Sequence, residues 1–249
     1  MSTSGEAIST SPEGAADGQT PVGLGRLYLI RHAQSTWNEE HRIQGQQDPP
    51  LSGLGRHQAA LLGRRFEGCR PRALYVSDLR RTRQTAETIA SATGLPAQPV
   101  PGLREIRLGE WEGRTGAELA IASPELWRRW TERADWDLIP GGEGGVAFAR
   151  RVRETLTELW ARHPVGDVLC VTHGGVVQTA LLGVLGRLPE GTFPFRIENA
   201  SISVLERRPS TATLLGAVHG PTIAGVNDVA HLATLLRDEV AREEVRHRA

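Results

Sequence analysis

Lysine is absent from this sequence of 249 residues, so all 29 of its Lys and Arg positions are arginine. A chain without lysine usually reflects a GC-rich coding genome rather than a functional demand. The arginines are balanced by 29 Asp and Glu residues, which gives a formal net charge of +0. A neutral chain has no overall basic field that would draw it to nucleic acid or anionic lipid. We therefore expect no nucleic-acid partner, and any binding of anions must depend on local groups of arginine.

Cysteine is scarce, and long apolar runs are missing. Cys69 lies in a predicted loop and Cys170 in an apolar run, which provides no disulfide framework and favours a reducing compartment. No segment approaches the roughly 20 apolar residues that a membrane span requires. The first residues also lack the basic start and apolar stretch of a secretion signal. We expect a cytoplasmic protein that has no membrane partner.

The length of the chain favours a single catalytic domain flanked by tails. Residues 1–24 are rich in Ser, Gly, Thr and Ala, and this composition is typical of a disordered tail. The domain is expected to cover residues 25–236. The charged residues 237–249 are expected to form a C-terminal tail.

Short apolar runs alternate with segments of helical periodicity, which is typical of an α/β fold with a mostly parallel sheet. The expected strands are residues 27–30, 73–76, 168–171, 202–205 and 213–218. The expected helices cover residues 56–66, a segment from Arg80 to the stop at Gly94 and Pro96, and the apolar periodic segments 148–159 and 176–184. Residues 102–145 break this alternation and carry four of the 6 Trp. The predicted fold class is a three-layer α/β/α sandwich with a small helical cap insertion at 102–145.

Basic and imidazole side chains follow three of the predicted strands. Arg31 and His32 follow the first strand, Arg81 comes shortly after the second, and His173 follows the strand at 168–171. Because ligand sites of open α/β sheets lie beyond the carboxyl ends of the strands, we expect these side chains to meet. Arginine binds phosphate oxygens bidentately, and a helix that begins at Gly174 adds backbone donors. The sequence therefore predicts a phosphate site.

Paired histidines can also bind a metal ion. Here no carboxylate or cysteine accompanies them at a ligand spacing, and neighbouring arginines would repel a cation. We expect no metal and no other cofactor.

Several motifs occur in a fixed order along the chain. They are Leu29-Ile30-Arg31-His32-Ala33-Gln34-Ser35-Thr36-Trp37-Asn38, Arg42-Ile43-Gln44-Gly45, Asp48-Pro49-Pro50-Leu51-Ser52, Ser77-Asp78-Leu79-Arg80-Arg81-Thr82, Leu103-Arg104-Glu105 with Leu108-Gly109-Glu110-Trp111-Glu112-Gly113, Gly141-Gly142-Glu143, Thr172-His173-Gly174-Gly175, and Asn227-Asp228 with His231-Leu232. In this order they resemble the histidine phosphatase superfamily, the phosphoglycerate mutase-like group. The resemblance covers about residues 26 to 232.

The resemblance implies a role for each candidate residue. His32 would be the nucleophile that becomes a phosphohistidine, and Glu105 the proton donor to the leaving group. The implied phosphate pocket consists of Arg31, Arg81 and His173. Further substrate-binding positions implied by the phosphatase branch are Asn38, Gln44 and Gly45. Arg80 and Arg83 flank Arg81 on the same helix, and the family pattern selects Arg81.

Two positions depart from the family pattern. Ala33 replaces the usual Gly after the nucleophile, and Gly144 replaces the Ser or Thr that commonly follows Gly-Gly-Glu. These departures affect the packing beside His32 and the N-cap of the helix near Val146, and neither removes a reacting group.

The implied function is hydrolysis of small phosphate monoesters, sugar-phosphate or phosphoglycerate-like, by a metal-independent phosphatase. A cofactor-dependent phosphoglycerate mutase is an alternative, although that group carries a longer segment between the catalytic Glu and Gly-Gly-Glu. A noncatalytic phospho-ligand scaffold is another, although it would need neither His32 nor Glu105. The sequence leaves open the substrate, a homodimer, and whether Trp127 and Trp130 contact substrate or the interior of the cap.

Overall fold

The computed structural model describes residues 24–133, 135–187, 194–207 and 220–235. The expected strand at 213–218, the C-terminal tail and all but the last residue of the N-terminal tail lie outside these ranges. In the described ranges, no helix combines the length and the apolar character needed to cross a bilayer.

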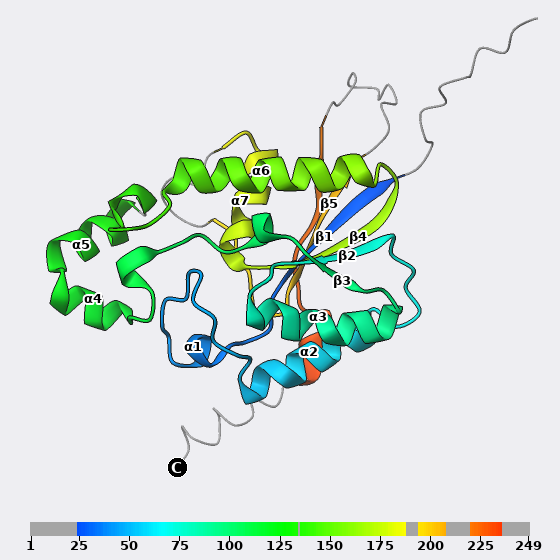
Figure 1. Ribbon diagram of the computed structural model, residues 1–249, viewed down its shortest axis with the longest axis horizontal. Coiled ribbons are helices and arrows are strands. Elements are labelled where there is room, and N and C mark those ends of the chain that lie inside the picture. The colour runs from blue at the N-terminus through cyan, green and yellow to red at the C-terminus, as the bar shows by residue number, and fades with distance from the viewer. Residues whose placement is uncertain (1–23, 134, 188–193, 208–219, 236–249) are drawn as a thin grey trace, which may run out of the picture.

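Six strands form one sheet in the described part of the chain, in the order β3-β2-β4-β1-β5-β6 (Figure 1). Their bounds are β1 Gly25–Arg31, β2 Ala73–Val76, β3 Ala97–Pro99, β4 Gly166–Thr172, β5 Ile202–Arg207 and β6 Thr222–Asp228. β3, β2, β4 and β1 pair in parallel, whereas β5 is antiparallel to both β1 and β6. The sheet is therefore mixed but mostly parallel, as the sequence predicted.

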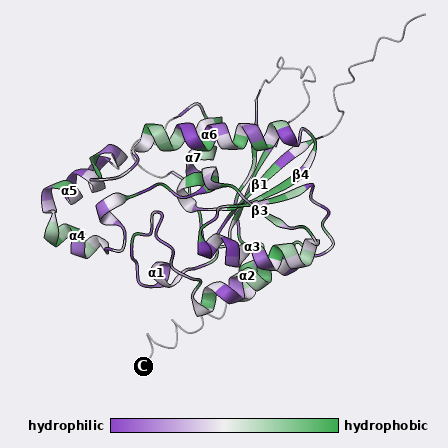
Figure 2. Ribbon diagram, viewed as in Figure 1, coloured by the Kyte–Doolittle hydropathy of each residue, from purple (hydrophilic) through white to green (hydrophobic). Residues whose placement is uncertain are grey.

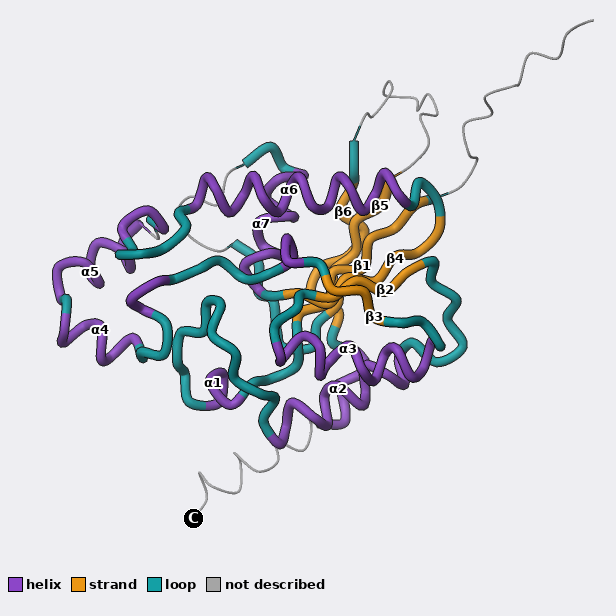
Figure 3. Tube along the Cα trace, viewed as in Figure 1, coloured by secondary structure: helices purple, strands orange, loops and turns teal. Residues whose placement is uncertain are grey.

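Helices cover both faces of the sheet, and Figures 1 and 3 show the resulting three layers. One face carries α2 (Gly53–Arg65) and α3 (Arg80–Thr93), and the other carries α6 (Gly145–Arg162) and α7 (Gly174–Val184). Successive side chains of β1 point to opposite faces, so Leu29 belongs to the core cluster under α6 and α7 and Ile30 to the cluster under α2 and α3. Figure 2 shows hydrophobic residues gathered on these central strands. The predicted α/β/α sandwich is confirmed.

Two helix boundaries follow from local capping. Ser52 accepts a hydrogen bond from the backbone N–H of Gly55 at 3.0 Å and caps α2, which therefore begins at Gly53 rather than at the expected Arg56. Gly94 ends α3 with φ of 72°, in the left-handed region that glycine adopts without cost. The expected stop of α3 at Gly94 is confirmed.

Residues 102–145, called the cap segment below, connect β3 to α6 and lie beyond one end of the sheet (Figure 3). Its helices are α4 (Gly116–Ala122) and α5 (Pro124–Arg133), with 3-10 turns η1 (Pro101–Leu103), η2 (Gly109–Trp111) and η3 (Trp136–Leu138) around them. Trp111, Leu119 and Trp136 are buried in the same cluster as the α6 and α7 side of the sheet. The cap segment therefore shares its core with the sandwich.

Candidate active site

A cavity of about 420 Å³ lies at the carboxyl end of β1, between the start of α7 and the cap segment. Its lining includes the predicted site residues Arg31, His32, Gln44, Gly45, Arg81 and Glu105. Asn38 and His173 are not among the lining residues. The topology explains why residues that follow different strands line the same cavity, because the carboxyl ends of parallel strands lie at one edge of the sheet.

His32 follows β1, and its ring is buried with one nitrogen already bonded. The backbone N–H donates to the carbonyl of Thr172 at 2.9 Å, and ring Nδ1 lies 2.7 Å from the carbonyl oxygen of Ala33. Since a carbonyl can only accept, Nδ1 carries the hydrogen, and Nε2 of the neutral ring keeps a free lone pair. Burial, followed by the charges of Arg81 and Arg31, lowers the pKa of His32 well below its usual value. The neutral ring is thus the dominant form at pH 7.

Arg81 is the arginine of its helix that reaches the cavity, as predicted, while Arg80 and Arg83 are exposed. Its guanidinium donates through Nη1 to the carbonyl of Gln47 at 2.7 Å and through Nη2 to that of Gly45 at 2.8 Å. Burial lowers the pKa of Arg81 to about 10, so the group stays charged at pH 7. Its hydrogen-bond partners are carbonyls rather than carboxylates, which leaves the positive charge available for an anion.

Arg31 supplies a second, partly buried cation from the end of β1. Its Nη1 donates to the carbonyl of Ile197 at 2.5 Å, and its Nε has no hydrogen-bond partner among the described residues. Burial lowers the pKa of Arg31, whereas the charges of Glu105 and Glu198 raise it. Two guanidinium groups therefore face one small cavity, an arrangement that suits a phosphoryl group.

His173 lies directly behind His32. Its ring is fully buried, with its centroid 5.3 Å from that of His32 in an edge-on arrangement. Nε2 is 2.8 Å from the hydroxyl of Ser77, and Nδ1 has no partner among the described residues. Burial, followed by the charges of Arg81 and His32, lowers the pKa of His173 well below its usual value. Two imidazoles are therefore kept neutral at the same end of the sheet.

Glu105 enters the cavity from the cap segment. Oε1 accepts from the backbone N–H of Ile106 at 2.9 Å, and Oε2 accepts from that of Gly175 at 3.0 Å. A Cβ on Gly175 would stand 2.2 Å from Oε1 of Glu105, so only glycine allows this approach. The Gly-Gly pair at the start of α7 thereby brings the carboxylate to the cavity that holds His32.

Asn38 and Gln44 meet at Ser35 beside the cavity. The Ser35 hydroxyl lies 3.0 Å from Oδ1 of Asn38 and 2.7 Å from Oε1 of Gln44. Oδ1 of Asn38 also accepts from the Ser35 backbone N–H and so completes the capping box of α1 (Thr36–Glu39). Substrate binding by Asn38 and Gln44 stays a prediction, since the structure assigns Asn38 first to this cap.

Gly45 shapes the loop that binds Arg81. Its φ is +50°, and a Cβ there would stand 2.1 Å from Oε1 of Glu112. The same carboxylate accepts from the backbone N–H groups of Gln46 at 3.0 Å and Leu108 at 2.9 Å. Glu112 therefore ties the loop after α1 to the cap segment, and Gly45 contributes its carbonyl to Arg81.

Some contributors to the site were missed from the sequence. The carbonyls of Gln47 and Ile197 accept from the two guanidinium groups, and a backbone carbonyl carries no sequence signal. Asn199, which donates to the carbonyl of His32 at 3.1 Å, lies outside every motif. Gln178 lines the cavity from α7, and its position one turn after Gly174 on an otherwise apolar helix could have indicated it.

Ala33 stands where the family pattern has a glycine, and the backbone there accepts an alanine. Its backbone N–H donates to the Thr85 hydroxyl at 3.1 Å, and its φ lies outside the left-handed region. An alanine therefore adopts this conformation without strain, and its carbonyl still binds the His32 ring.

The side chains of the site do not form a set of metal ligands in the described part of the chain. Within the described ranges, His, Cys, Asp and Glu form no group of three that could hold a metal ion. The charged side chains that line the cavity are Arg31, Arg81 and Glu105. This donor set suits an anion rather than a cation.

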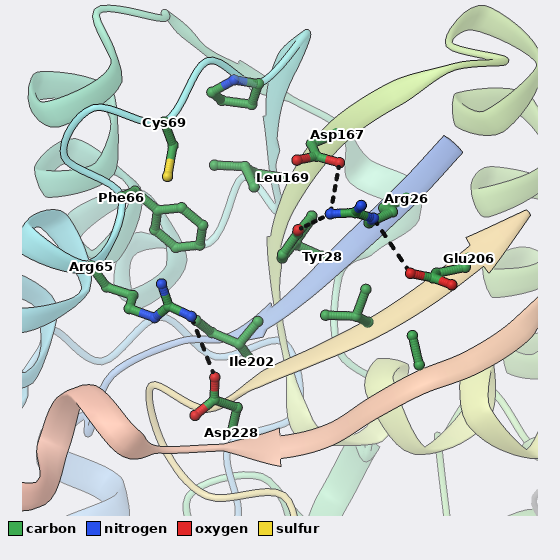
Figure 4. A pocket seen from close by; sticks show the side chains of 13 residues that line it. Arg26, Tyr28, Arg65, Phe66, Cys69, Asp167, Leu169, Ile202, Glu206 and Asp228 are labelled. Carbon is green, nitrogen blue, oxygen red and sulfur yellow. Dashed lines mark hydrogen bonds and ion pairs between the residues drawn. The ribbon is translucent and has the colours of Figure 1, made fainter. Parts of the chain in front are cut away.

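Another cavity, of about 320 Å³, lies on the face of the sheet that carries α2 (Figure 4). Its two arginines are already paired, Arg26 with Glu206 at 3.4 Å and Asp167 at 3.8 Å, and Arg65 with Asp228 at 3.7 Å. Its lining contains no histidine. Its arginines are compensated by carboxylates, although the exposed thiol of Cys69 also lines it, so the cavity around His32 is the better candidate for binding an anion.

Comparison with protein families gives a match to one of them. Residues 27–218 match the model described as histidine phosphatase superfamily (branch 1). A curated relative from Yersinia enterocolitica, named probable phosphoglycerate mutase, is 33% identical over 218 residues, which are 87% of this chain and 99% of the relative.

Two solved structures are similar to this chain in fold and in sequence. The YhfR protein of Bacillus stearothermophilus superposes with a TM-score of 0.71 and 30% identity, over 84% of this chain and 99% of that one. A mycobacterial glucosyl-3-phosphoglycerate phosphatase, in complex with VO3, superposes with a TM-score of 0.68 and 32% identity, over 81% and 98% of the two chains. The match covers nearly the whole length of these proteins.

Proposed function

Since this chain belongs to the histidine phosphatase superfamily, we propose that it hydrolyses small phosphate monoesters through a phosphohistidine formed on His32. Phosphoric monoester hydrolysis is the reaction class of this family's phosphatase neighbours and of this chain. The observation that carries the residue assignment is the His32 ring, whose Nδ1 is bonded to Ala33 while Nε2 is free in a site that also holds Arg31 and Arg81.

The first half of the reaction transfers the phosphoryl group to the enzyme. Nε2 of His32 attacks phosphorus, the bond to the leaving oxygen breaks, and Glu105 gives that oxygen a proton. Charge builds on the equatorial oxygens, where Arg31 and Arg81 stabilise it. The neutral His173 ring packs against the ring of His32, with the two centroids 5.3 Å apart, and supports the nucleophile without lining the cavity.

The second half releases phosphate. Glu105, now ionised, takes a proton from water, and the resulting hydroxide attacks the phosphohistidine from the side that the alcohol has left. The nitrogen–phosphorus bond breaks, His32 regains its neutral ring, and Glu105 again holds the proton. No metal ion takes part in either half.

The decisive experiment is to trap the intermediate. The protein is mixed with 4-nitrophenyl phosphate in excess chelator, quenched during turnover, and mapped by mass spectrometry under basic conditions that preserve phosphohistidine. Phosphate should appear on His32, and His32→Ala should have neither adduct nor turnover. His57→Ala, which changes an exposed histidine of α2, is the matched control. Phosphate on another residue, full turnover of His32→Ala, or activity that requires an added divalent ion would contradict the proposal.

A phosphoglycerate mutase is the second candidate, because curated relatives carry that name. A mutase must keep the intermediate from water long enough to transfer phosphate to a second acceptor. The part of the cap segment between Glu105 and Gly141 is short, which favours access of water to the intermediate instead. With 3-phosphoglycerate and a bisphosphoglycerate primer, we expect free phosphate as the main product. Efficient 2-phosphoglycerate formation with little phosphate would support the mutase.

Composition supports the remaining parts of the proposal. The net charge of +0 favours a small-molecule phosphate ester over nucleic acid as the partner. The two cysteines are free thiols, Cys69 exposed and Cys170 buried, which favours a cytoplasmic location. A homodimer stays an open alternative to a monomer.

A further inference from the structure

The wall of the cavity away from His32 is apolar and largely aromatic. It is formed by Leu108, Trp111, Trp130, Trp136, Ile139 and Phe195. The indole of Trp130 packs edge-on against Trp111 at 5.5 Å and against Trp136 at 6.4 Å between ring centroids. Mutual packing of this kind fixes the rings before a substrate arrives. The part of the substrate that is not phosphate therefore meets a rigid hydrophobic surface.

Cations are confined to the phosphate end of the cavity. In the described part of the chain, Arg31 and Arg81 are the basic residues of the lining, and both lie beside His32. Arg128 of the cap segment is paired on the surface with Glu125 and Glu132, and Arg151 is paired with Glu143. No described cation of the lining is left for a second anionic group on the substrate.

A carboxylate on the leaving group would therefore be buried at a cost. It would lose its water against indole rings without gaining a counterion. A neutral group does not face this penalty.

Two polar atoms in this wall have no partner among the described residues. They are the indole N–H of Trp130 and Oε1 of Gln178, whose side chain is 6% exposed and whose amide N–H donates to the carbonyl of Phe195. Both atoms are inaccessible to solvent, so the surface that this wall presents to a substrate is apolar.

We propose that this phosphatase prefers phosphate monoesters of uncharged alcohols with an aromatic or other apolar body, and that it discriminates against esters whose leaving group carries a carboxylate. The inference rests on the proposed function of the same site. It narrows that function, because phosphoglycerate-type esters then become poor substrates.

The test compares two esters that differ at one substituent, 4-methylbenzyl phosphate and 4-carboxybenzyl phosphate. Both leave as benzylic alkoxides, so their demands on Glu105 are closely similar. We expect kcat/KM of the wild-type protein to favour the methyl ester on the order of 100-fold, since an unpaired buried charge is penalised far more than a missing apolar contact. 3-Phosphoglycerate should be as poor as the carboxylated ester. Equal or better use of the carboxylated ester would overturn the inference.

A variant with a positive charge in the apolar wall of the cavity tests the same inference, and a variant with that charge outside the cavity is its control. Leu108→Arg provides a counterion for the carboxylate. It should therefore reduce the ratio of kcat/KM between the methyl ester and the carboxylated ester at least about tenfold. Leu185→Arg makes the same change at a position 53% exposed after α7 and outside the lining, and it should leave the preference unchanged. If Leu108→Arg does not fold, the kcat/KM values of the wild-type protein for the two esters still test the inference. Absence of phosphate on His32 with every ester would instead refute the proposed function, which keeps the two failures distinct.

Discussion

Glu105 shows how one carboxylate can be fixed and still be free to exchange a proton. Its two oxygens accept one backbone hydrogen bond each, from Ile106 and from Gly175. Each carboxylate oxygen has two acceptor sites, so one site on each oxygen remains for the leaving group or for water. Its neighbours Glu110 and Glu112 lack this combination, because Glu110 is exposed and Glu112 is occupied by the N–H groups of Gln46 and Leu108.

The variant Glu105→Gln separates proton transfer from positioning. Gln keeps the shape but cannot cycle a proton, so hydrolysis of benzyl phosphate should fall by about a hundred- to ten-thousand-fold. Phosphoenzyme formation from 4-nitrophenyl phosphate should be nearly preserved, because nitrophenolate leaves without a proton. Stopped-flow absorbance should therefore show a burst of nitrophenolate and then slow turnover, since the second half still needs a base.

The control is Glu110→Gln, which alters an exposed carboxylate in η2 and should leave both esters unaffected. If Glu105→Gln slowed the two esters equally and gave no burst, Glu105 would not be the proton donor.

The side chains that we propose to react could be singled out from the sequence, whereas the backbone groups that bind them could not. Arg31, His32 and Glu105 stand in motifs, and the cavity brings them together. The carbonyls of Gln47 and Ile197 that bind the two guanidinium groups come from loops whose conformation depends on tertiary packing. Residue type says nothing about such backbone contacts, so this part of the site required coordinates.

The start of α6 explains the second departure from the family pattern. Gly144 precedes the helix with φ of +77°, where a Ser or Thr cap would be strained. The N–H of Gly145 is instead accepted by Oδ1 of Asp137 at 3.0 Å. A carboxylate from the cap segment thus replaces the local cap and holds the first turn of α6 against η3.

This geometry predicts that restoring a side chain at Gly144 is harmful. A Cβ there would stand 2.4 Å from Oδ1 of Asp137 in addition to the backbone strain. Gly144→Ala and Gly144→Ser should each lower the free energy of unfolding by about 1–3 kcal/mol. Urea unfolding should show a lower midpoint with an unchanged m value.

Gly53 provides the matched control, because it lies in the first turn of α2 with nothing within 4 Å of an added Cβ. Gly53→Ala should be neutral or stabilising by up to about 1 kcal/mol, since alanine favours the helix and restricts the unfolded chain. Equal effects of Gly53→Ala and Gly144→Ala would show that Asp137 does not constrain this turn.

The strands that could be predicted are those that lie inside the sheet and carry a run of apolar residues. β1, β2 and β4 lie inside the sheet and read as continuous apolar runs. β3 has three residues, ends at Pro99 and lies at an edge, and β6 is an edge strand with Gly225 in its middle and irregular pairing to β5. Edge strands of mixed polarity lack a clear period, so neither was predicted.

At the scale of the whole molecule, the fold buries the two histidines of the site away from solvent. His32 is 3% exposed, His173 is 0% exposed, and both share the end of the sheet with the buried Arg81 and the partly buried Arg31. Protonation of either ring would add a third positive charge to a region that already holds Arg31 and Arg81. The same burial that favours a neutral nucleophile therefore makes the fold sensitive to acid.

The last prediction is the pH dependence of stability that follows from these two rings. Their folded-state pKa values are lowered well below the ordinary histidine value of 6.5, so the unfolded chain binds more protons once the pH falls below about 6.5. Stability is therefore fully present above pH 6.5 and is lost as the pH falls toward the folded-state pKa values. Each histidine contributes up to about 1.4 kcal/mol per pH unit in that window. Urea unfolding of wild type between pH 7 and 5 should show this slope, and the double variant His32→Gln with His173→Gln should show a smaller one. His163 and His231, whose pKa values are also lowered, are present in both proteins and cancel in the comparison. An unchanged slope in the double variant would mean that the two rings accept protons in the folded state, and the neutral nucleophile would lose its physical basis.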